Sequence, residues 1–494
     1  MSGTQAYDAI VIGGGIAGLI AASYLAKGGK RVQLLEARNK LGGRCETAPI
    51  ADGFSAPAAA HALYALDPRA VEELKLAKHG LSFAVRDMPR VALRAGTNPI
   101  VLGRDTRAAA RTIAAYSLAD ARAFPEFRRT VFALARRMRA TWWENGTGDP
   151  RANDCALLER LKRQSAAAWL DSWFETDALK AMLAMDVVES GLSPLEPGSG
   201  LALLWRASQE MCGLQGAVAV PNGGPGSLAQ ALVCAAQAAG VDIRTGVAAA
   251  RLHADGDVAA SVELESGEML ASSVVLSSLS RAQTLAGLGR NANVGLGEAN
   301  LLARRRKAHD AAKIIFAISG LPPLRDTVLL RGRMIVVDRM ESLVSAHEQA
   351  RSGALPAELP LEIVIPTLTD LSLAPPGQHV VSVLVRPVPP ATIDWNFLKA
   401  ALVERVALAI ERVMPEFARH IVVVKAFTPQ DWIDIHAADG GLASASRILA
   451  PWDARIKTEI KGLYLCGASA EPADAISGRA ARIAAAFANS EQEP

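Results

Sequence analysis

Cysteine is scarce in this chain, and its distribution excludes two classes of protein. The five cysteines, Cys45, Cys155, Cys212, Cys234 and Cys466, are scattered over 494 residues, and no two form a C-x-x-C pair. An odd set of widely spaced cysteines does not predict a disulfide framework. A dithiol reductase needs two closely spaced thiols, so this activity is excluded as well. We expect free thiols in a reducing, cytoplasmic compartment, with Cys45 and Cys466 as small buried residues.

An excess of charge of one sign is also missing. Lysine and arginine together number 53, against 50 for aspartate and glutamate. A nucleic-acid-binding protein would need a basic face or stripe, so we expect no nucleic-acid partner. The eight histidines show no H-x-x-x-H or similar spacing. We therefore expect no metal site.

The chain has little that could cross a membrane. Residues 9–26 are mostly apolar, but they contain a glycine cluster at 13–15. They also lack the basic segment and the cleavage site that flank the apolar core of a signal peptide. No other run reaches the roughly 18 apolar residues that span a bilayer. We expect a soluble protein without a transmembrane segment, whose contact with a membrane is at most peripheral.

One predicted helix, over residues 125–143, offers a place for such peripheral contact. Its apolar side carries Phe127, Val131, Leu134, Met138 and Trp142, and its other side carries Arg128, Arg129, Arg136, Arg137 and Arg139. A basic amphipathic helix can lie on an anionic membrane. The same pattern is typical of a helix that covers a domain core with its charged face in water. We favour the second interpretation.

The N-terminal residues predict a dinucleotide-binding unit. Residues 8–12 indicate a buried strand, 16–27 a helix and 31–35 a second buried strand. The motif Gly13-x-Gly15-Ile16-Ala17-Gly18 joins the first strand to the helix, which is the context that makes this glycine pattern informative. Its glycines permit a tight turn, a close approach to a pyrophosphate and close helix–strand packing, and the helix N-terminus attracts phosphates. Glu36 ends the second strand, where a carboxylate can bind a ribose hydroxyl.

The residues that follow distinguish FAD from NAD. Glu36-Ala37-Arg38 is followed by Leu41-Gly42-Gly43-Arg44. This arrangement resembles the extended FAD fingerprint of the amine-oxidase and carotenoid-desaturase flavoproteins. Gly42 and Gly43 let the backbone pass the diphosphate, and Arg44 offers it a charged fork. Arg38 could do the same near the adenosine end.

A second signal lies near the C-terminus. Residues 460–468 (IKGLYLCGA) predict a strand that leads through Gly467 and Ala468 toward a helix over 477–489. Together with residues 221–228 (PNGGPGSL), 313–315 (KII), 319–322 (SGLP), 428–431 (TPQD) and 440–441 (GG), this segment resembles the phytoene-desaturase-like branch that is named for a pyridine nucleotide-disulfide oxidoreductase domain. The resemblance implies that this unit brings the flavin to a helix N-terminus. It also implies that Val247, Gly467, Ala468 and Ile476 contact the cofactor.

The chain departs from this family after Ala468. The family usually carries a Thr-His-Pro-Gly-Gly-Gly-like stretch, whereas this chain has residues 469–475 (SAEPADA), with Glu471 at the histidine position. Glu471 and Asp474 are therefore expected near the flavin ring. They are either acid/base groups or helix caps.

Lys313 and His61 complete the set of candidates. In the related amine oxidases, a lysine at the start of the matching strand lies close to the flavin, and the resemblance implies this place for Lys313. The alternative is an exposed strand end, because lysine is rarely buried. His61 falls where the chain returns toward the flavin in relatives, and we assign it no role.

These observations predict a two-part α/β architecture, because 494 residues exceed what a single core of roughly 250–300 residues can organise. We expect a discontinuous Rossmann-type FAD-binding domain from residues 1–66, 213–290 and 428–494. An inserted mixed α+β substrate domain is expected from 67–212 and 291–427.

The resemblance implies an FAD-dependent oxidoreductase that desaturates or dehydrogenates a fairly apolar small molecule. Hydride or electrons would pass to non-covalently bound FAD, with reoxidation by oxygen, a quinone or another acceptor. One alternative is an amine or amino-acid oxidase, which would need an aromatic pair beside the flavin; with aromatics at 5% no such pair is evident. A flavin-binding partner protein that has lost turnover is the alternative of another class. The sequence leaves the substrate, the acceptor and the oligomeric state open, and an oligomer is compatible with it.

Overall fold

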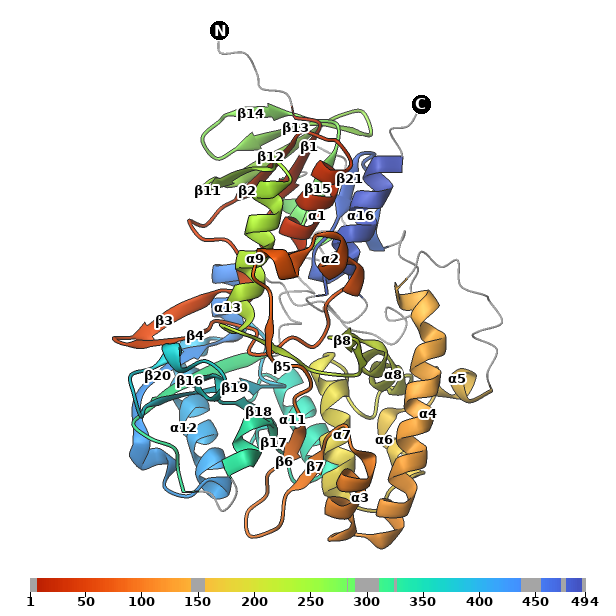
Figure 1. The fold of residues 1–494 in the computed structure, drawn as a ribbon, viewed down its shortest axis with the longest axis vertical. Helices are drawn as coiled ribbons and strands as arrows, with labels where there is room; N and C mark the ends of the chain where they lie inside the picture. Colours follow the sequence, from red (N-terminus) through yellow and green to blue (C-terminus); the bar gives the residue numbers. More distant parts are fainter. Residues whose placement is uncertain are drawn as a thin grey trace.

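A computed structural model of the chain describes residues 7–143, 156–281, 283–288, 311–323, 327–436, 455–471 and 477–490. Two sheets organise it, one in the upper part of Figure 1 and one in the lower part. The architecture is mixed α/β, as the sequence predicts.

The upper sheet is parallel and is built from segments far apart in the sequence. Its strands are ordered β11-β2-β1-β15-β21, and every neighbouring pair is parallel. Their bounds are β1 Ala9–Ile12, β2 Val32–Glu36, β11 Asp242–Thr245, β15 Val275–Ser277 and β21 Leu463–Leu465. The chain leaves the central strand β1 toward one edge first and returns later to the other, which creates a topological switch point beside β1.

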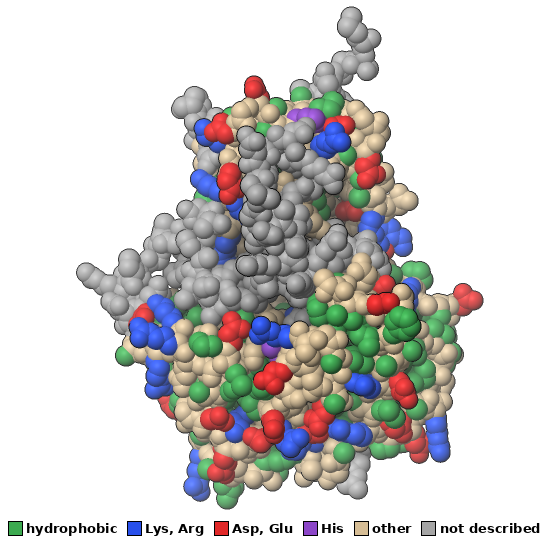
Figure 2. All heavy atoms as spheres, turned by 180° about the vertical axis from the view of Figure 1, so that it is seen from behind, with side chains coloured by type: hydrophobic (Ala, Val, Ile, Leu, Met, Phe, Trp, Pro, Cys, Tyr) green, Lys and Arg blue, Asp and Glu red, His purple; other side chains and the backbone are tan. Residues whose placement is uncertain are grey.

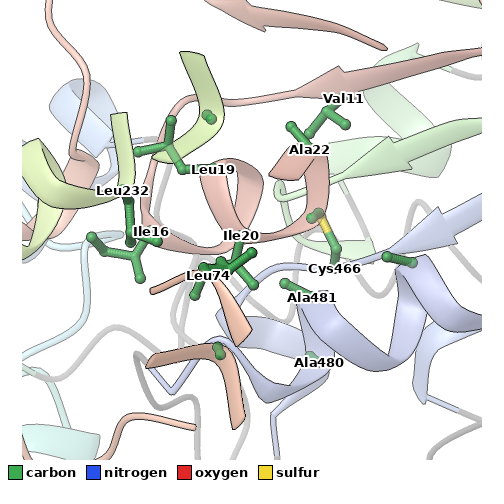
Figure 3. Close-up of a cluster of buried hydrophobic side chains, with 14 of the residues drawn as sticks. Val11, Ile16, Leu19, Ile20, Ala22, Leu74, Leu232, Cys466, Ala480 and Ala481 are labelled. Atoms are coloured by element: carbon green, nitrogen blue, oxygen red, sulfur yellow. The ribbon is translucent and has the colours of Figure 1, made fainter. Parts of the chain in front are cut away.

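Helices cover one face of this sheet. The helix α1 (Ile16–Lys27) packs between α9 (Pro225–Ala238) and α16 (Arg479–Ser490). Figure 3 shows Ile16, Leu19 and Ile20 of α1 directed into this contact, with Cys466 beside them. Cys45 and Cys466 are fully buried in the same cluster, as expected for small core residues.

An antiparallel three-stranded sheet covers the other face. It consists of β12 (Ala249–Asp255), β13 (Val258–Leu264) and β14 (Met269–Ala271). Alternate residues of β1 explain the two layers, because Val11 faces α1 while Ile10 and Ile12 face this smaller sheet.

The lower sheet has seven strands, ordered β20-β16-β19-β18-β17-β6-β7. It is antiparallel except where β17 meets β6. The strands are β6 Arg90–Ala92, β7 Ile100–Leu102, β16 Ala312–Ile318, β17 Arg333–Val336, β18 Leu361–Val364, β19 His379–Val385 and β20 Ile421–Phe427. The helix α12 (Trp395–Val413) packs on one face.

A helical block lies beside this sheet, on the right in Figure 1. It contains α3 Thr106–Ala114, α4 Leu118–Trp143, α5 Ala156–Leu161, α6 Ala166–Asp171, α7 Asp177–Glu189, α8 Gly200–Ser208 and α11 Met340–Arg351. The apolar residues predicted for one side of α4, from Phe127 to Trp142, are all buried in its core. The expectation that α4 covers a domain core is confirmed.

Short elements connect the two halves. They are β3 Thr47–Ala51, β4 Phe54–Pro57, α2 Pro68–Glu73, β5 Phe83–Val85, β8 Glu210–Met211, β9 Leu214–Gln215, β10 Val220–Pro221 and α13 Pro429–His436. The hairpin β3–β4 packs against β16 and β19 of the lower sheet.

The surface bears charges of both signs. On the face drawn in Figure 2, the coloured Lys, Arg, Asp and Glu side chains are interspersed. Of the helices in the described ranges, none is long and apolar enough to cross a membrane.

Candidate functional site

A cavity of about 310 Å³ opens at the carboxyl ends of the five strands of the parallel sheet. Its walls come from the segments that follow β1, β2, β11, β15 and β21, together with β12 and the first turn of α1. In open parallel sheets this edge is where ligands bind. The lining residues are Ile12, Gly13, Gly15, Ile16, Ala17, Leu35, Glu36, Ala37, Arg38, Gly43, Arg44, Val247, Ala248, Ala249, Ser278, Leu279, Cys466, Gly467, Ala468, Glu471 and Gly478. We refer to it as the dinucleotide cavity.

Backbone geometry explains the glycines at the entrance to α1. Gly13 has a φ of +97°, which side chains rarely tolerate. A Cβ at Gly18 would lie 1.8 Å from the carbonyl oxygen of Gly13, so only glycine lets α1 approach the end of β1 this closely. Gly18 does not line the cavity but fixes its shape. No side chain caps the N-terminus of α1, so its free N–H groups face a site suited to phosphate.

The second glycine turn packs against the first. The N–H of Gly42 donates to the carbonyl oxygen of Gly14 at 2.9 Å, and Gly42 has a φ of +109°. Gly43 lines the cavity beside Gly15, whereas Gly42 lies behind it. Gly43 and Arg44 of the motif at 41–44 therefore form one wall of the cavity.

Glu36 organises the turn as well as facing the cavity. Its Oε2 accepts a hydrogen bond from the N–H of Gly14 at 2.7 Å, and its Oε1 accepts one from the N–H of Arg38 at 2.9 Å. Arg38 forms an ion pair with Glu46 at 2.7 Å through Nη2, while its Nη1 is buried and has no partner in the part of the chain that the structure describes. That orphaned nitrogen fits an acceptor supplied by a ligand.

The C-terminal segment closes the opposite end. Gly467 follows β21, and a Cβ there would lie 2.0 Å from the carbonyl oxygen of Ser278, so these two strand ends touch. Glu471 is buried, and its Oε1 accepts from the Ser477 hydroxyl at 2.6 Å and from the N–H of Ala480 at 2.8 Å. Both donors lie at the start of α16, so Glu471 caps this helix.

The other oxygen of Glu471 is available to a ligand. Its Oε2 is buried and has no hydrogen-bond partner among the described residues, although the residue lines the dinucleotide cavity. Burial raises the pKa of this carboxyl above its usual range. Asp474 and Ile476, the other residues predicted here, lie outside the described residues.

Lys313 lies in the lower sheet and does not line the dinucleotide cavity. It is the second residue of β16, and its side chain is fully buried, so the alternative of an exposed strand end is wrong. Its Nζ donates to the carbonyl oxygen of Ala59 at 2.6 Å. Burial lowers the pKa of this amine to about 7. Such a group can hold or release a proton near neutral pH.

A buried polar network surrounds His61, and sequence reasoning missed it. Its Nε2 lies 3.0 Å from Glu362 Oε1, its Nδ1 lies 3.1 Å from Ser382 Oγ, and Tyr64 also bonds Glu362. Arg333 donates to the other oxygen of Glu362 at 2.6 Å. Burial, assisted by the nearby charge of Lys313, lowers the pKa of His61 to about 4. Only the assembled sheet brings these residues together, and no motif marks them.

Metal and disulfide chemistry find no support in the described ranges. No group of three or more His, Cys, Asp or Glu side chains there could hold a metal ion. The described cysteines, Cys45, Cys212, Cys234 and Cys466, are free thiols.

A family model for flavin-containing amine oxidoreductases matches residues 16–473. The chain belongs to this family. It is therefore an FAD-dependent oxidoreductase, and a flavin is its cofactor.

Curated relatives cover nearly the whole chain. Pyridine nucleotide-disulfide oxidoreductase domain-containing protein 2 of Mus musculus is 30% identical, over 97% of this chain and 92% of that protein. The lycopene-forming phytoene desaturase of Pantoea ananas is 27% identical, over 95% of this chain and 96% of its own. Among solved structures, cyclohexylamine oxidase from Brevibacterium oxydans shares the fold, with a TM-score of 0.61 at 16% identity over 99% of this chain and 100% of that one.

The dinucleotide cavity collects most of the predicted cofactor residues. Gly13, Gly15, Ile16, Ala17, Glu36, Ala37, Arg38, Gly43, Arg44, Val247, Gly467 and Ala468 all line it, as does Glu471. The sequence analysis missed Ser278 and Leu279, which also line it. Their position directly after a buried strand could have predicted them, since the carboxyl ends of parallel strands meet at one edge of the sheet.

Proposed function

We propose that the dinucleotide cavity binds FAD non-covalently and that the enzyme oxidises a fairly apolar small molecule. FAD accepts hydride or electrons when bound and passes them to oxygen, a quinone or another acceptor. The observation that carries this proposal is the cavity itself. Two glycine turns, an uncapped helix N-terminus and the C-terminal strand end converge on it.

The residues divide between the two ends of the cofactor. We assign the adenosine and diphosphate end to the turns at Gly13–Gly18 and Gly42–Arg44, with Glu36 as the ribose acceptor. Gly467, Ala468 and the free oxygen of Glu471 then face the ribityl and ring end. The buried thiol of Cys466 also lines the cavity, and burial raises its pKa to about 12. A protonated thiol is a poor nucleophile, which supports non-covalent binding.

We propose Lys313 as the residue that moves protons in the reaction. Its amine is buried and its pKa is lowered to about 7, so both protonation states are accessible at neutral pH. Ala59, which holds its Nζ, belongs to the segment that links β4 to the His61 network. Glu471 and Asp474 are the next candidates, although the helix-capping contacts of Glu471 favour a structural role for it.

The domain division follows from the same assignment. We propose that residues 1–66, 213–290 and 428–494 form the FAD-binding domain, and that 67–212 and 291–427 form the substrate domain. The parallel sheet draws all its strands from the first set, and all seven strands of the lower sheet come from the second. The hairpin β3–β4 connects the two.

An aromatic pair does exist next to Lys313, but its geometry does not favour an amine-oxidase cage. Phe427 pairs with Lys313 in the sheet and stacks on Trp432, with ring centroids 5.4 Å apart and planes at 23°. The two rings occupy each other's faces, so they leave no space for a substrate between them. We therefore keep oxidation of an apolar molecule as the proposed reaction.

Anaerobic bleaching of the bound flavin tests this function. Purified holoenzyme is mixed without oxygen with carotenoid precursors, amines and fatty-chain compounds, and the flavin absorbance is followed. We expect an apolar compound to reduce the flavin. Reduction by amines alone would favour an amine oxidase. If no compound reduces the flavin, a flavin-binding partner protein without turnover is favoured instead.

A further inference from the structure

A second cavity, of about 150 Å³, lies among α4, α7, α8 and the strands β6 and β7. It shares no lining residue with the dinucleotide cavity. One wall is aromatic and aliphatic and contains Phe124, Phe127 and Phe132 of α4. Arginines line the rest of it, accompanied by two aspartates. We call it the arginine cavity.

Three of its arginines are neutralised by carboxylates. Arg90 pairs with Asp186, and Arg104 pairs with Asp87 at 2.8 Å. Arg333 pairs with Glu362 at 2.6 Å and with Glu189 at 3.0 Å. These pairs account for the negative charge in the walls.

Two arginines, Arg206 of α8 and Arg128 of α4, form no direct ion pair among the described residues. The charges of Asp186 and Glu189 act on Arg206 only through space, and that of Asp87 acts on Arg128 in the same way. Arg206 is 6% exposed and donates only to backbone oxygens, those of Tyr64, Gly216 and Ala217, while its Nε has no partner. Arg128 donates to the carbonyl oxygen of Gly103 at 2.7 Å and to a threonine hydroxyl. Burial lowers the pKa of both guanidinium groups, although arginine remains charged.

A buried charge without a direct ion pair is unfavourable, and folded proteins normally pair it. Here two cations without a direct ion pair line one cavity, whose apolar wall contains three phenylalanines. An anion would neutralise them, and a planar carboxylate suits the guanidinium fork. The aromatic wall requires that the anion carry an apolar body.

We propose that the arginine cavity binds the carboxylate of a small molecule with an apolar body, through Arg206 and Arg128. The body packs against the phenylalanine wall. The cavity is also next to the His61 network, because the guanidinium groups of Arg206 and Arg333 lie 5.7 and 4.8 Å from the ring centroid of Tyr64. Recognition of this molecule as the substrate rests on the function proposed above, whereas the binding site itself does not.

Calorimetric titration of the holoprotein with benzoate tests the site, with benzamide and benzyl alcohol as uncharged probes of the same size. We expect benzoate to bind and the uncharged probes to bind at least about tenfold more weakly, because a charge-assisted hydrogen bond is lost. Arg128→Gln should weaken benzoate binding about tenfold. The matched control is Arg129→Gln on the same helix, which is exposed, does not line the cavity and should leave binding unchanged.

A second variant keeps the proposal testable if Arg128→Gln does not fold. Asp186→Asn removes the partner of Arg90 and adds net positive charge to the walls, so benzoate should bind several-fold more tightly. Equal affinity for benzoate and benzamide would overturn the proposal, as would equal effects of Arg128→Gln and Arg129→Gln.

The flavin spectrum shows whether the arginine cavity is part of the substrate site or a separate ligand site. A shift of the flavin absorbance on benzoate binding identifies the cavity as part of the substrate site, and binding without a shift identifies a separate ligand site. Benzoate binding to a protein that carries no flavin would refute the proposed function and leave this inference standing.

Discussion

Burial controls the chemistry available to Lys313. Its amine is fully enclosed in the lower sheet and bonds one carbonyl oxygen, that of Ala59. The resemblance placed a lysine at the start of this strand, but burial depends on β19 and β20, which flank it from distant parts of the sequence. The same holds for the His61 network and for the lack of a direct ion pair at Arg128 and Arg206 among the described residues. No local pattern predicts contacts of this kind.

We predict that Lys313→Met slows flavin reduction, or reoxidation by oxygen, at least about tenfold while FAD stays bound. A positioned proton-transfer group typically contributes about 10²–10⁴ in rate. Rapid-reaction absorbance traces of both half-reactions measure the effect. If both traces match those of the wild type, Lys313 has only a structural role, and Glu471 and Asp474 become the candidates.

The stability of the protein should depend on pH through the same residue. The pKa of Lys313 is about 7 in the fold, against about 10.4 for an unfolded lysine. Between these values the unfolded chain binds more protons, so the free energy of unfolding should rise with pH, by on the order of 4 kcal/mol in total. Below pH 7 this contribution to the slope disappears. Denaturant titrations at pH 7, 8.5 and 10 should show the rise in the wild type and a smaller one in Lys313→Met; equal slopes would refute the lowered pKa.

Glu36→Ala should weaken FAD binding by about 1–3 kcal/mol, the usual cost of an unmet buried hydrogen bond. The variant loses both the ribose acceptor and the bonds that hold Gly14 and Arg38. Equilibrium dialysis against FAD measures the change, and Glu36→Gln, which retains an acceptor oxygen, should lose less. Unchanged affinity in Glu36→Ala would show that the carboxylate does not touch the cofactor.

At the scale of elements, the sequence predicts those helices and strands whose bounds are set by neighbouring residues. The helix predicted over residues 16–27 matches α1, and the strand predicted within residues 460–468 contains β21, because glycines and runs of apolar residues delimit both. The strands β6 and β7 were not predicted. They have three residues each and lie in a segment rich in helix formers. Pairing with a strand distant in the sequence stabilises them, because β6 pairs with β17 and β7 pairs with β6.

The basic face of α4 should bind anionic membranes weakly or not at all. Arg139 pairs with Glu210 at 3.0 Å and Arg129 pairs with Glu126, so few charges remain for a lipid surface. Each basic residue near such a surface contributes only about 1 kcal/mol. Flotation with anionic vesicles tests this expectation. Salt-sensitive flotation that is lost in Arg136→Glu plus Arg137→Glu would contradict it.

At the scale of the whole molecule, three distant segments build one sheet edge. Parallel strands need crossover connections, so residues 9–36, 242–277 and 463–465 can meet only when the intervening chain folds elsewhere. That intervening chain forms the whole seven-stranded lower sheet and the helical block (Figure 1). The glycine motifs predicted the cavity because its walls are the ends of these strands. The lower sheet and the helical block, which contain the arginine cavity, have no comparable sequence signal.

The central claim is that the cavity at this sheet edge holds FAD without a covalent bond. The most direct measurement is release of the chromophore from purified protein by acid or heat, followed by mass spectrometry of the supernatant and of the polypeptide. We predict that all of the yellow chromophore is released, that its mass is that of FAD, and that the polypeptide keeps its unmodified mass. A folded protein that binds NADP but no flavin, or a flavin that remains attached to the chain, would contradict the account.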